Sequence, residues 1–157
     1  MRTLIIYFSR TGTTKKVAEM LKIKLNADIE EITEPTDRRG VLGYLKSGKE
    51  AMQKIMPEIG EIKSDLKAYD LVIIGTPVWG WNISSPIRSF VVKYILGSTP
   101  QIAVFCTQGG SGSDKAVAEI ESLSGKKSVA NLALNTKEVM EDKFSGKVEE
   151  FVNKLII

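Results

Sequence analysis

The chain of 157 residues carries 22 Lys and Arg against 19 Asp and Glu, with no histidine and one cysteine. Without histidine it cannot form a Ser-His-Asp triad, a Cys-His pair or a histidine-ligated metal site. The single Cys106 excludes an intrachain disulfide framework and thiolate metal clusters, and we expect it to be a small buried hydrophobe. The net charge of +3 is too small for the basic stripe of a nucleic-acid binder, so we expect no nucleic-acid partner.

The first apolar run, residues 4–8, ends at once in a polar loop. It is too short for the core of a signal peptide and far too short to cross a bilayer. We therefore expect one domain over residues 1–157, a cytoplasmic location and no membrane insertion.

Apolar runs of strand length alternate with stretches of helical period along the chain. The expected strands are residues 4–8, 29–32, 71–74, 102–105 and 129–134, and the clearest helical stripes lie in 17–25, 87–95, 116–123 and 144–155. Nearly continuous apolar strands are typical of a parallel sheet covered on both faces. The pattern predicts an α/β fold with a doubly wound, five-stranded parallel sheet and helices on both faces. Order 2-1-3-4-5 is one of its two common solutions and places a crevice at the carboxyl ends of the first and third strands.

The segment 35–57 fits this alternation less well. A stripe of apolar residues suggests a helix, but Gly43 and Gly48 each weaken it by about 1 kcal/mol. We expect this segment to pack as an excursion rather than as a plain crossover helix. The residues of the stripe are Val41, Tyr44, Leu45, Met52 and Ile55.

The loop after the first strand joins it directly to a helix. Its residues are Ser9, Arg10, Thr11, Gly12, Thr13 and Thr14. Hydroxyls can donate to phosphate oxygens, the helix N-terminus offers unpaired backbone N–H groups, and glycine allows a tight turn. We expect the loop to hold a phosphate dianion, with Arg10 contributing mainly backbone. The alternative is an ordinary hydroxyl-rich helix cap.

The loop expected after the third strand contains both tryptophans of the chain. Its residues are Thr76, Pro77, Val78, Trp79, Gly80, Trp81 and Asn82. Two tryptophans in a loop at the binding edge suggest a platform for a flat ligand. The alternative is that one of them, Trp81, covers the end of the sheet or forms a subunit contact. Together with the irregular segment 35–57, this leaves a homodimer open.

The loop after the fourth strand is rich in glycine. It holds Thr107, Gln108, Gly109, Gly110, Ser111, Gly112 and Ser113. Glycines let backbone amides approach the polar edge of a ligand closely. The spacing does not match a dinucleotide-binding fingerprint, so this loop alone indicates only flexibility.

These residues resemble the flavodoxin family, and the resemblance covers the whole chain. Ser9-x-Thr11-Gly12-x-Thr14 matches the phosphate loop of that family, and Trp79-Gly80 resembles its aromatic-glycine pair beside the flavin. The resemblance implies FMN as the cofactor, with its phosphate on residues 9–14 and its ring system between the loops 76–82 and 107–113. It further implies that Trp79 flanks the ring, that Thr76, Pro77, Val78, Gly80 and Asn82 shape its edge, and that the amides of Gly109 and Gly110 meet its pyrimidine end.

Two features depart from typical flavodoxins. Residues 107–113 contain no aromatic side chain, which resembles instead the flavodoxin-like NAD(P)H:quinone reductases. The loops near the expected flavin carry six basic residues and few acids, namely Arg10, Lys15, Lys16, Arg38, Arg39 and Arg88. Because surrounding carboxylates would disfavour an anionic reduced flavin, we expect a less negative final one-electron potential than in acidic carriers. Three roles remain open for Arg38 and Arg39: they could line the substrate side of the flavin, bind a phosphate of NADPH, or lie in a surface turn.

Two functions follow from the resemblance, with a third kept as an alternative. The first is electron transfer through bound FMN to a redox partner protein. The second is an NAD(P)H-dependent quinone or flavin reductase that uses the same FMN site for two-electron transfer. The third is a regulatory or scaffolding protein that has lost its flavin. A receiver domain, a low-mass tyrosine phosphatase and a nucleotide P-loop are excluded because their defining residues are missing. No side chain is an evident acid–base catalyst, and we expect no metal site.

Overall fold

The computed structural model describes residues 1–98 and 100–156, and its central layer is a parallel sheet. Its strands lie in the order β2-β1-β3-β5-β6, and a short strand β4 pairs antiparallel with the end of β3. The strands are β1 (Thr3–Tyr7), β2 (Asp28–Glu31), β3 (Leu71–Trp79), β4 (Asn82–Ile83), β5 (Gln101–Gln108) and β6 (Ser128–Asn135). Since β4 is short and lies off the main path, this is the order expected from the sequence, with the last two strands renumbered.

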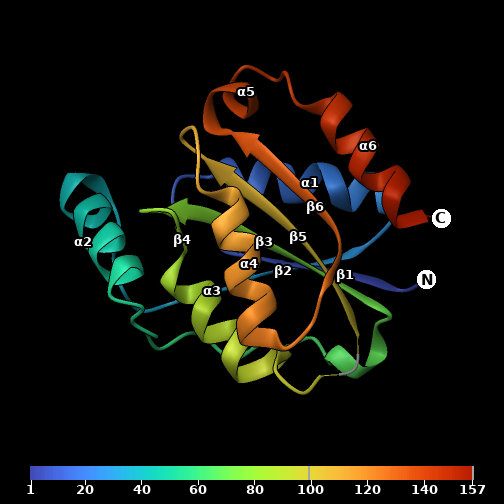
Figure 1. Cartoon of the computed structure of the whole chain (residues 1–157), viewed down its shortest axis with the longest axis horizontal. Coiled ribbons are helices and arrows are strands. Elements are labelled where there is room, and N and C mark those ends of the chain that lie inside the picture. The colour runs from blue at the N-terminus through green and yellow to red at the C-terminus, as the bar shows by residue number, and fades with distance from the viewer. Residues whose placement is uncertain (99, 157) are drawn as a thin grey trace.

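Helices cover both faces of this sheet (Figure 1). They are α1 (Thr13–Leu25), α2 (Gly40–Met52), α3 (Ser85–Phe90), α4 (Ser113–Ser124), α5 (Thr136–Met140) and α6 (Ser145–Ile156). A short 3-10 helix η1 (Leu66–Ala68) precedes β3, and the stretch expected as one helix over 87–95 changes after α3 to a π-helix η2 (Val91–Ile95). None of the helices in the described ranges has the length and hydrophobicity needed to cross a bilayer.

The core is split by the sheet into two clusters. On β1, Leu4 and Ile6 pack on the α3 and α4 side, whereas Ile5 and Tyr7 pack on the α1 and α6 side. The same alternation runs through β3 and β5, because successive side chains of a strand point to opposite faces. Burial on both faces explains why these strands read as nearly continuous apolar runs. Cys106 is fully buried on β5, as expected.

Helix α2 packs through small residues rather than through its apolar stripe. The helix suggested by that stripe is present, but the five apolar side chains of the stripe are exposed, from 41% at Ile55 just beyond the helix to 74% at Val41. The buried residues are Gly43, Ser47 and Ala51, which recur every fourth position. Gly43 is required there, since a Cβ would lie 2.1 Å from the backbone of Arg38. In Figure 1, α2 stands apart from the two helix layers, beyond the carboxyl ends of the strands.

Candidate functional site

The three predicted loops meet at the carboxyl edge of the sheet, where they enclose a crevice of about 330 Å³. Ten of the residues predicted for the site line it: Arg10, Thr11, Thr13, Thr14, Pro77, Val78, Trp79, Thr107, Gln108 and Gly109. Six others lie outside the lining, namely Ser9, Gly12, Thr76, Gly80, Asn82 and Gly110. No carboxylate of the described residues lines the crevice, which suits an anionic ligand.

The first loop is arranged around the hydroxyl of Ser9. Its Oγ accepts the backbone N–H of Gly12 at 3.0 Å and that of Lys15 at 3.3 Å. Gly12 has a φ of 95°, a conformation that would strain a residue with a side chain. Gly12 leads directly into α1. Because the first N–H groups of a helix have no intrahelical acceptor, those of Thr13 and Thr14 remain for a ligand. The Ser9 hydroxyl keeps its own proton to donate.

Thr14 joins the first loop to the third. Its Oγ1 lies 2.8 Å from the Oγ1 of Thr107, and both residues are buried. This contact between residues 93 positions apart fixes the floor of the crevice. Both hydroxyls line the crevice, and each has hydrogen-bonding capacity left for a ligand.

The prediction that residues 76–82 form a loop is wrong in part, because β3 continues to Trp79 and the chain then turns back into β4. Gly80 and Trp81 have φ values of 55° and 61°, and positive φ at both central residues is what a tight type I′ hairpin turn requires. Asn82 Nδ2 donates to the Gly80 carbonyl at 2.6 Å, and Thr76 Oγ1 donates to Ser84 Oγ at 3.1 Å. Asn82 and Thr76 thus brace the hairpin instead of lining the crevice.

The two tryptophans occupy different environments. Trp79 is only 8% exposed, lines the crevice and meets Phe8 edge to face with ring centroids 5.6 Å apart. Trp81 is 60% exposed, and its Nε1 donates to Ser111 Oγ at 3.0 Å. Trp81 therefore ties the hairpin to the third loop.

The third loop is held by Gln108. Its Oε1 accepts the backbone N–H of Ser113 at 2.9 Å, its Nε2 donates to Asn135 Oδ1 at 3.3 Å, and its carbonyl accepts the Thr136 hydroxyl at 3.2 Å. A Cβ on Gly109 or Gly110 would meet nothing within 4 Å, so both glycines border open space. These contacts anchor the start of the loop and leave its glycines accessible.

Arg38 is the centre of a buried ionic network rather than an open phosphate site. Its guanidinium forms ion pairs with Glu34 and, at 2.7 Å, with Glu50, and it donates to Ser47 Oγ and Ser85 Oγ at 3.2 Å each. Burial opposes the charge of Arg38, but hydrogen bonds to Glu34 and Glu50 outweigh it and raise its pKa. The surface turn considered for this residue is therefore wrong.

Ion pairs offset much of the basic character expected around the site. In the described part of the chain, four of the six cations are paired: Lys16 with Asp142, Arg38 with Glu34 and Glu50, Arg39 with Asp37, and Arg88 with Glu119. The expectation of a less negative potential thus loses most of the charges on which it depended.

Two residues that line the crevice were not among the predicted site residues, Tyr44 and Thr136. Tyr44 comes from α2, and the guanidinium of Arg10 lies 5.5 Å from the centre of its ring. The sequence signal for Tyr44 was the set of small residues at 43, 47 and 51, which marks the packed face of α2 and leaves Tyr44 at its flank. Thr136 begins α5, which had no apolar stripe to reveal it.

The described residues offer neither a cluster of potential metal ligands nor an exposed thiol. Within residues 1–98 and 100–156, no three His, Cys, Asp or Glu side chains gather as potential metal ligands. Burial raises the pKa of the Cys106 thiol to about 12, which keeps it neutral and unreactive as a nucleophile.

The family model described as Flavodoxin matches residues 2–155. The chain belongs to the flavodoxin family. Among solved structures, this chain is similar to a flavoprotein from Lactobacillus acidophilus NCFM that was crystallised in complex with FMN. The two share 26% identity at a TM-score of 0.74, over 89% of this chain and 97% of the other.

Two further flavodoxins share the fold. An oxidised Flavodoxin 2 from Bacillus cereus is 19% identical at a TM-score of 0.56, over 96% of this chain and 99% of that chain. A flavodoxin from the domain Archaea is 18% identical at a TM-score of 0.57, over 98% and 99% of the two chains. A comparison with curated protein sequences gave no match. The doubly wound flavodoxin-like architecture expected from the sequence is thus confirmed.

Proposed function

We propose that this flavodoxin binds FMN in the crevice between its three loops and transfers electrons through it. The observation that carries the proposal is the composition of the crevice lining. Hydroxyls at the N-terminus of α1 and the indole of Trp79 line the same crevice. FMN has the matching groups, with a phosphate at one end and a flat aromatic ring system at the other. The crystallised relative with FMN supports the same assignment.

The phosphate end would be held by the first loop. Thr11, Thr13 and Thr14 line the crevice there, and Ser9 orders the loop while it keeps one hydroxyl proton to donate. A helix N-terminus favours a dianion because its free N–H groups and the helix dipole both carry positive partial charge. The guanidinium of Arg10 lies over the ring of Tyr44 and donates to the Arg38 carbonyl at 3.3 Å, so Arg10 would contribute mainly its backbone.

The ring end would lie between the hairpin and the third loop. Trp79 supplies an aromatic face, Pro77 and Val78 continue it, and the backbone at Gly109 can approach the polar edge of the ring without a Cβ in the way. Bound FMN would supply the electron-carrying chemistry, and the chain would supply binding, orientation and exclusion of water.

The direct test is titration of the purified protein with FMN, followed by anaerobic reduction with dithionite while the absorption spectrum is recorded. We expect saturable binding and a bound-flavin spectrum that passes through a one-electron reduced form. A protein that stays colourless and does not bind FMN saturably would contradict the proposal and favour a scaffolding role.

The second candidate is an NAD(P)H-dependent quinone or flavin reductase at the same site. It is favoured by the third loop, because residues 107–113, of which Thr107, Gln108 and Gly109 line the crevice, provide no aromatic ring to cover the flavin. Such an enzyme would oxidise NADH or NADPH when a quinone is present and would pass to the fully reduced flavin almost directly. Steady-state oxidation of both nucleotides with and without quinone separates it from a one-electron carrier.

A further inference from the structure

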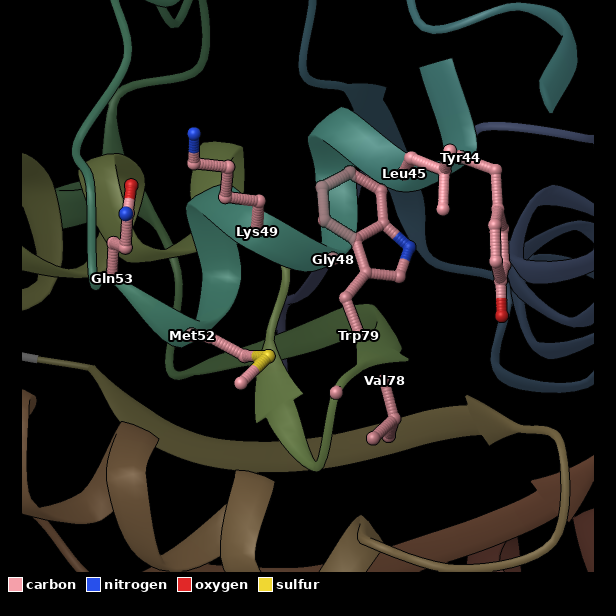
Figure 2. Close-up of a pocket in the computed structure, with 9 residues that line it drawn as sticks. Tyr44, Leu45, Gly48, Lys49, Met52, Gln53, Val78 and Trp79 are labelled. Carbon is pink, nitrogen blue, oxygen red and sulfur yellow. The ribbon is translucent and has the colours of Figure 1, made fainter. Parts of the chain in front are cut away.

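A second cavity lies beside the crevice, in a groove between α2 and the β3–β4 hairpin (Figure 2). Its volume is about 450 Å³, within the range of pockets that hold small organic molecules. Leu45 and Met52 of α2 and Val78 and Trp79 of the hairpin give it mostly apolar walls. Tyr44, Val78 and Trp79 line both cavities, so the indole of Trp79 stands at the boundary between them.

Gly48 lines this groove and has no side chain to occupy it. A glycine inside a helix costs about 1 kcal/mol relative to alanine, so its presence calls for a reason. Gly43 on the same helix has one, because its Cβ would collide with the Arg38 backbone at 2.1 Å. A Cβ on Gly48 would meet nothing within 4 Å, and Gly48 lines the groove. Its effect is therefore to leave space in the groove rather than to allow α2 to pack.

One side of the groove is polar. Lys49 and Gln53 lie together there, whereas Tyr44 lies on the opposite side with Trp79 between them (Figure 2). Among residues 1–98 and 100–156, no carboxylate forms an ion pair with Lys49. The neighbouring Lys46 instead approaches Glu50 at 4.0 Å, and Glu50 itself pairs with Arg38. The groove thus combines an apolar body with one unpaired cation and an amide at its mouth.

We propose that this groove is a binding site for a small apolar organic anion, such as an aromatic carboxylate. The apolar body would pack between Met52 and the Trp79 indole, and the carboxylate would meet the Lys49 ammonium and the Gln53 amide. The site adjoins the crevice proposed for FMN, but the proposal does not depend on FMN because the groove is formed by protein residues alone.

The test is calorimetric titration of the full chain with 2-naphthoate, and with its uncharged methyl ester as the comparison. We expect saturable binding of the acid in flavin-free and FMN-loaded protein. Gly48→Leu fills the groove with a better helix former and should weaken naphthoate binding by about tenfold or more. Lys49→Met keeps the apolar stem, so it should weaken the acid by about threefold and leave the ester unchanged.

Two control variants change the same residue types at helical positions outside the groove, Gly146 on α6 and Lys46 on α2. Gly146→Leu, at an exposed helical position with open space around it, and Lys46→Met, outside the groove, should both leave naphthoate binding unchanged. Naphthoate binding that is absent, or that survives Gly48→Leu, would overturn the proposal. So would a dimer that Gly48→Leu dissociates, since a second copy of the chain would then fill the groove. Because FMN binding is titrated separately, failure here leaves the proposed flavin site standing.

Discussion

The guanidinium of Arg38 lies 5.1 Å from the centre of the Trp79 indole ring. The same guanidinium is held by Glu34 and Glu50, and Glu50 belongs to α2. A cation over an aromatic face contributes about 2 kcal/mol when both groups are removed from water. The contact therefore fixes the indole that borders both the crevice and the groove, and it ties α2 to the sheet although the large apolar residues of that helix face outward.

Replacing Arg38 by methionine should reduce the free energy of unfolding by about 3–5 kcal/mol, because Glu34 would remain buried without a counter-charge and Glu50 would keep only Lys46, at 4.0 Å. Urea unfolding followed by circular dichroism measures this change. Arg39→Met is the matched control, since Arg39 pairs with Asp37 while its own side chain is 90% exposed, and we expect no measurable change. A loss in Arg38→Met as small as that in the control would show that the network does not stabilise the fold.

Replacing Thr11 by alanine should weaken FMN binding by about 1–3 kcal/mol, because a phosphate oxygen would lose its hydroxyl donor. Quenching of FMN fluorescence on titration gives the dissociation constant. Thr11→Ser keeps the hydroxyl and should bind FMN nearly as well as the unchanged protein. Equal affinity in all three proteins would remove Thr11 from the phosphate site.

The two tryptophans should respond differently to substitution. Trp79→Leu should weaken FMN binding by about 1 kcal/mol, the contribution of an aromatic pair beyond its buried area, and should shift the flavin absorption bands. Trp81→Leu removes an exposed indole that lies outside the crevice, together with its hydrogen bond to Ser111, so it should change both quantities less than Trp79→Leu does. If Trp81→Leu had the larger effect on affinity and spectrum, the ring would have been assigned to the wrong tryptophan.

Glu121 should make stability depend on pH in the acid range. Its carboxylate accepts hydrogen bonds from the Ser128 hydroxyl at 2.7 Å and the Ser128 backbone N–H at 3.0 Å, and it pairs with Lys127. These contacts lower its pKa from 4.5 to about 2.

A carboxyl group whose pKa is lower in the folded than in the unfolded protein stabilises the fold at pH values above its unfolded pKa. This stabilisation is lost as the pH falls toward the pKa of the folded protein. We therefore expect about 1–2 kcal/mol, after allowance for solvent screening, to disappear as the pH falls from 4.5 toward 2. Urea unfolding at a series of pH values should show a shallower acid dependence in Glu121→Gln. An unchanged slope in that variant would mean that other carboxylates account for the acid sensitivity.

The sequence by itself determined the architecture and the place of the site. Strands buried on both faces leave continuous apolar runs at 71–74 and 102–105, and their alternation with helical stripes indicates a parallel sheet. The carboxyl ends of such strands share one edge, so the sequence alone is enough to place the loops 9–14 and 107–113 side by side.

Only the tertiary structure decided the orientation of α2 and the charge balance near the site. An apolar stripe predicts a buried face only when that face meets the core, but here the approach of Gly43 to the Arg38 backbone places the small-residue face inward. The partners of Arg38 lie 4 and 12 residues away in the chain, and that of Arg88 lies 31 residues away. A count of charges treated both arginines as unpaired, because the pairs of Arg38 with Glu50 and of Arg88 with Glu119 depend on distances in space that the order of residues does not show.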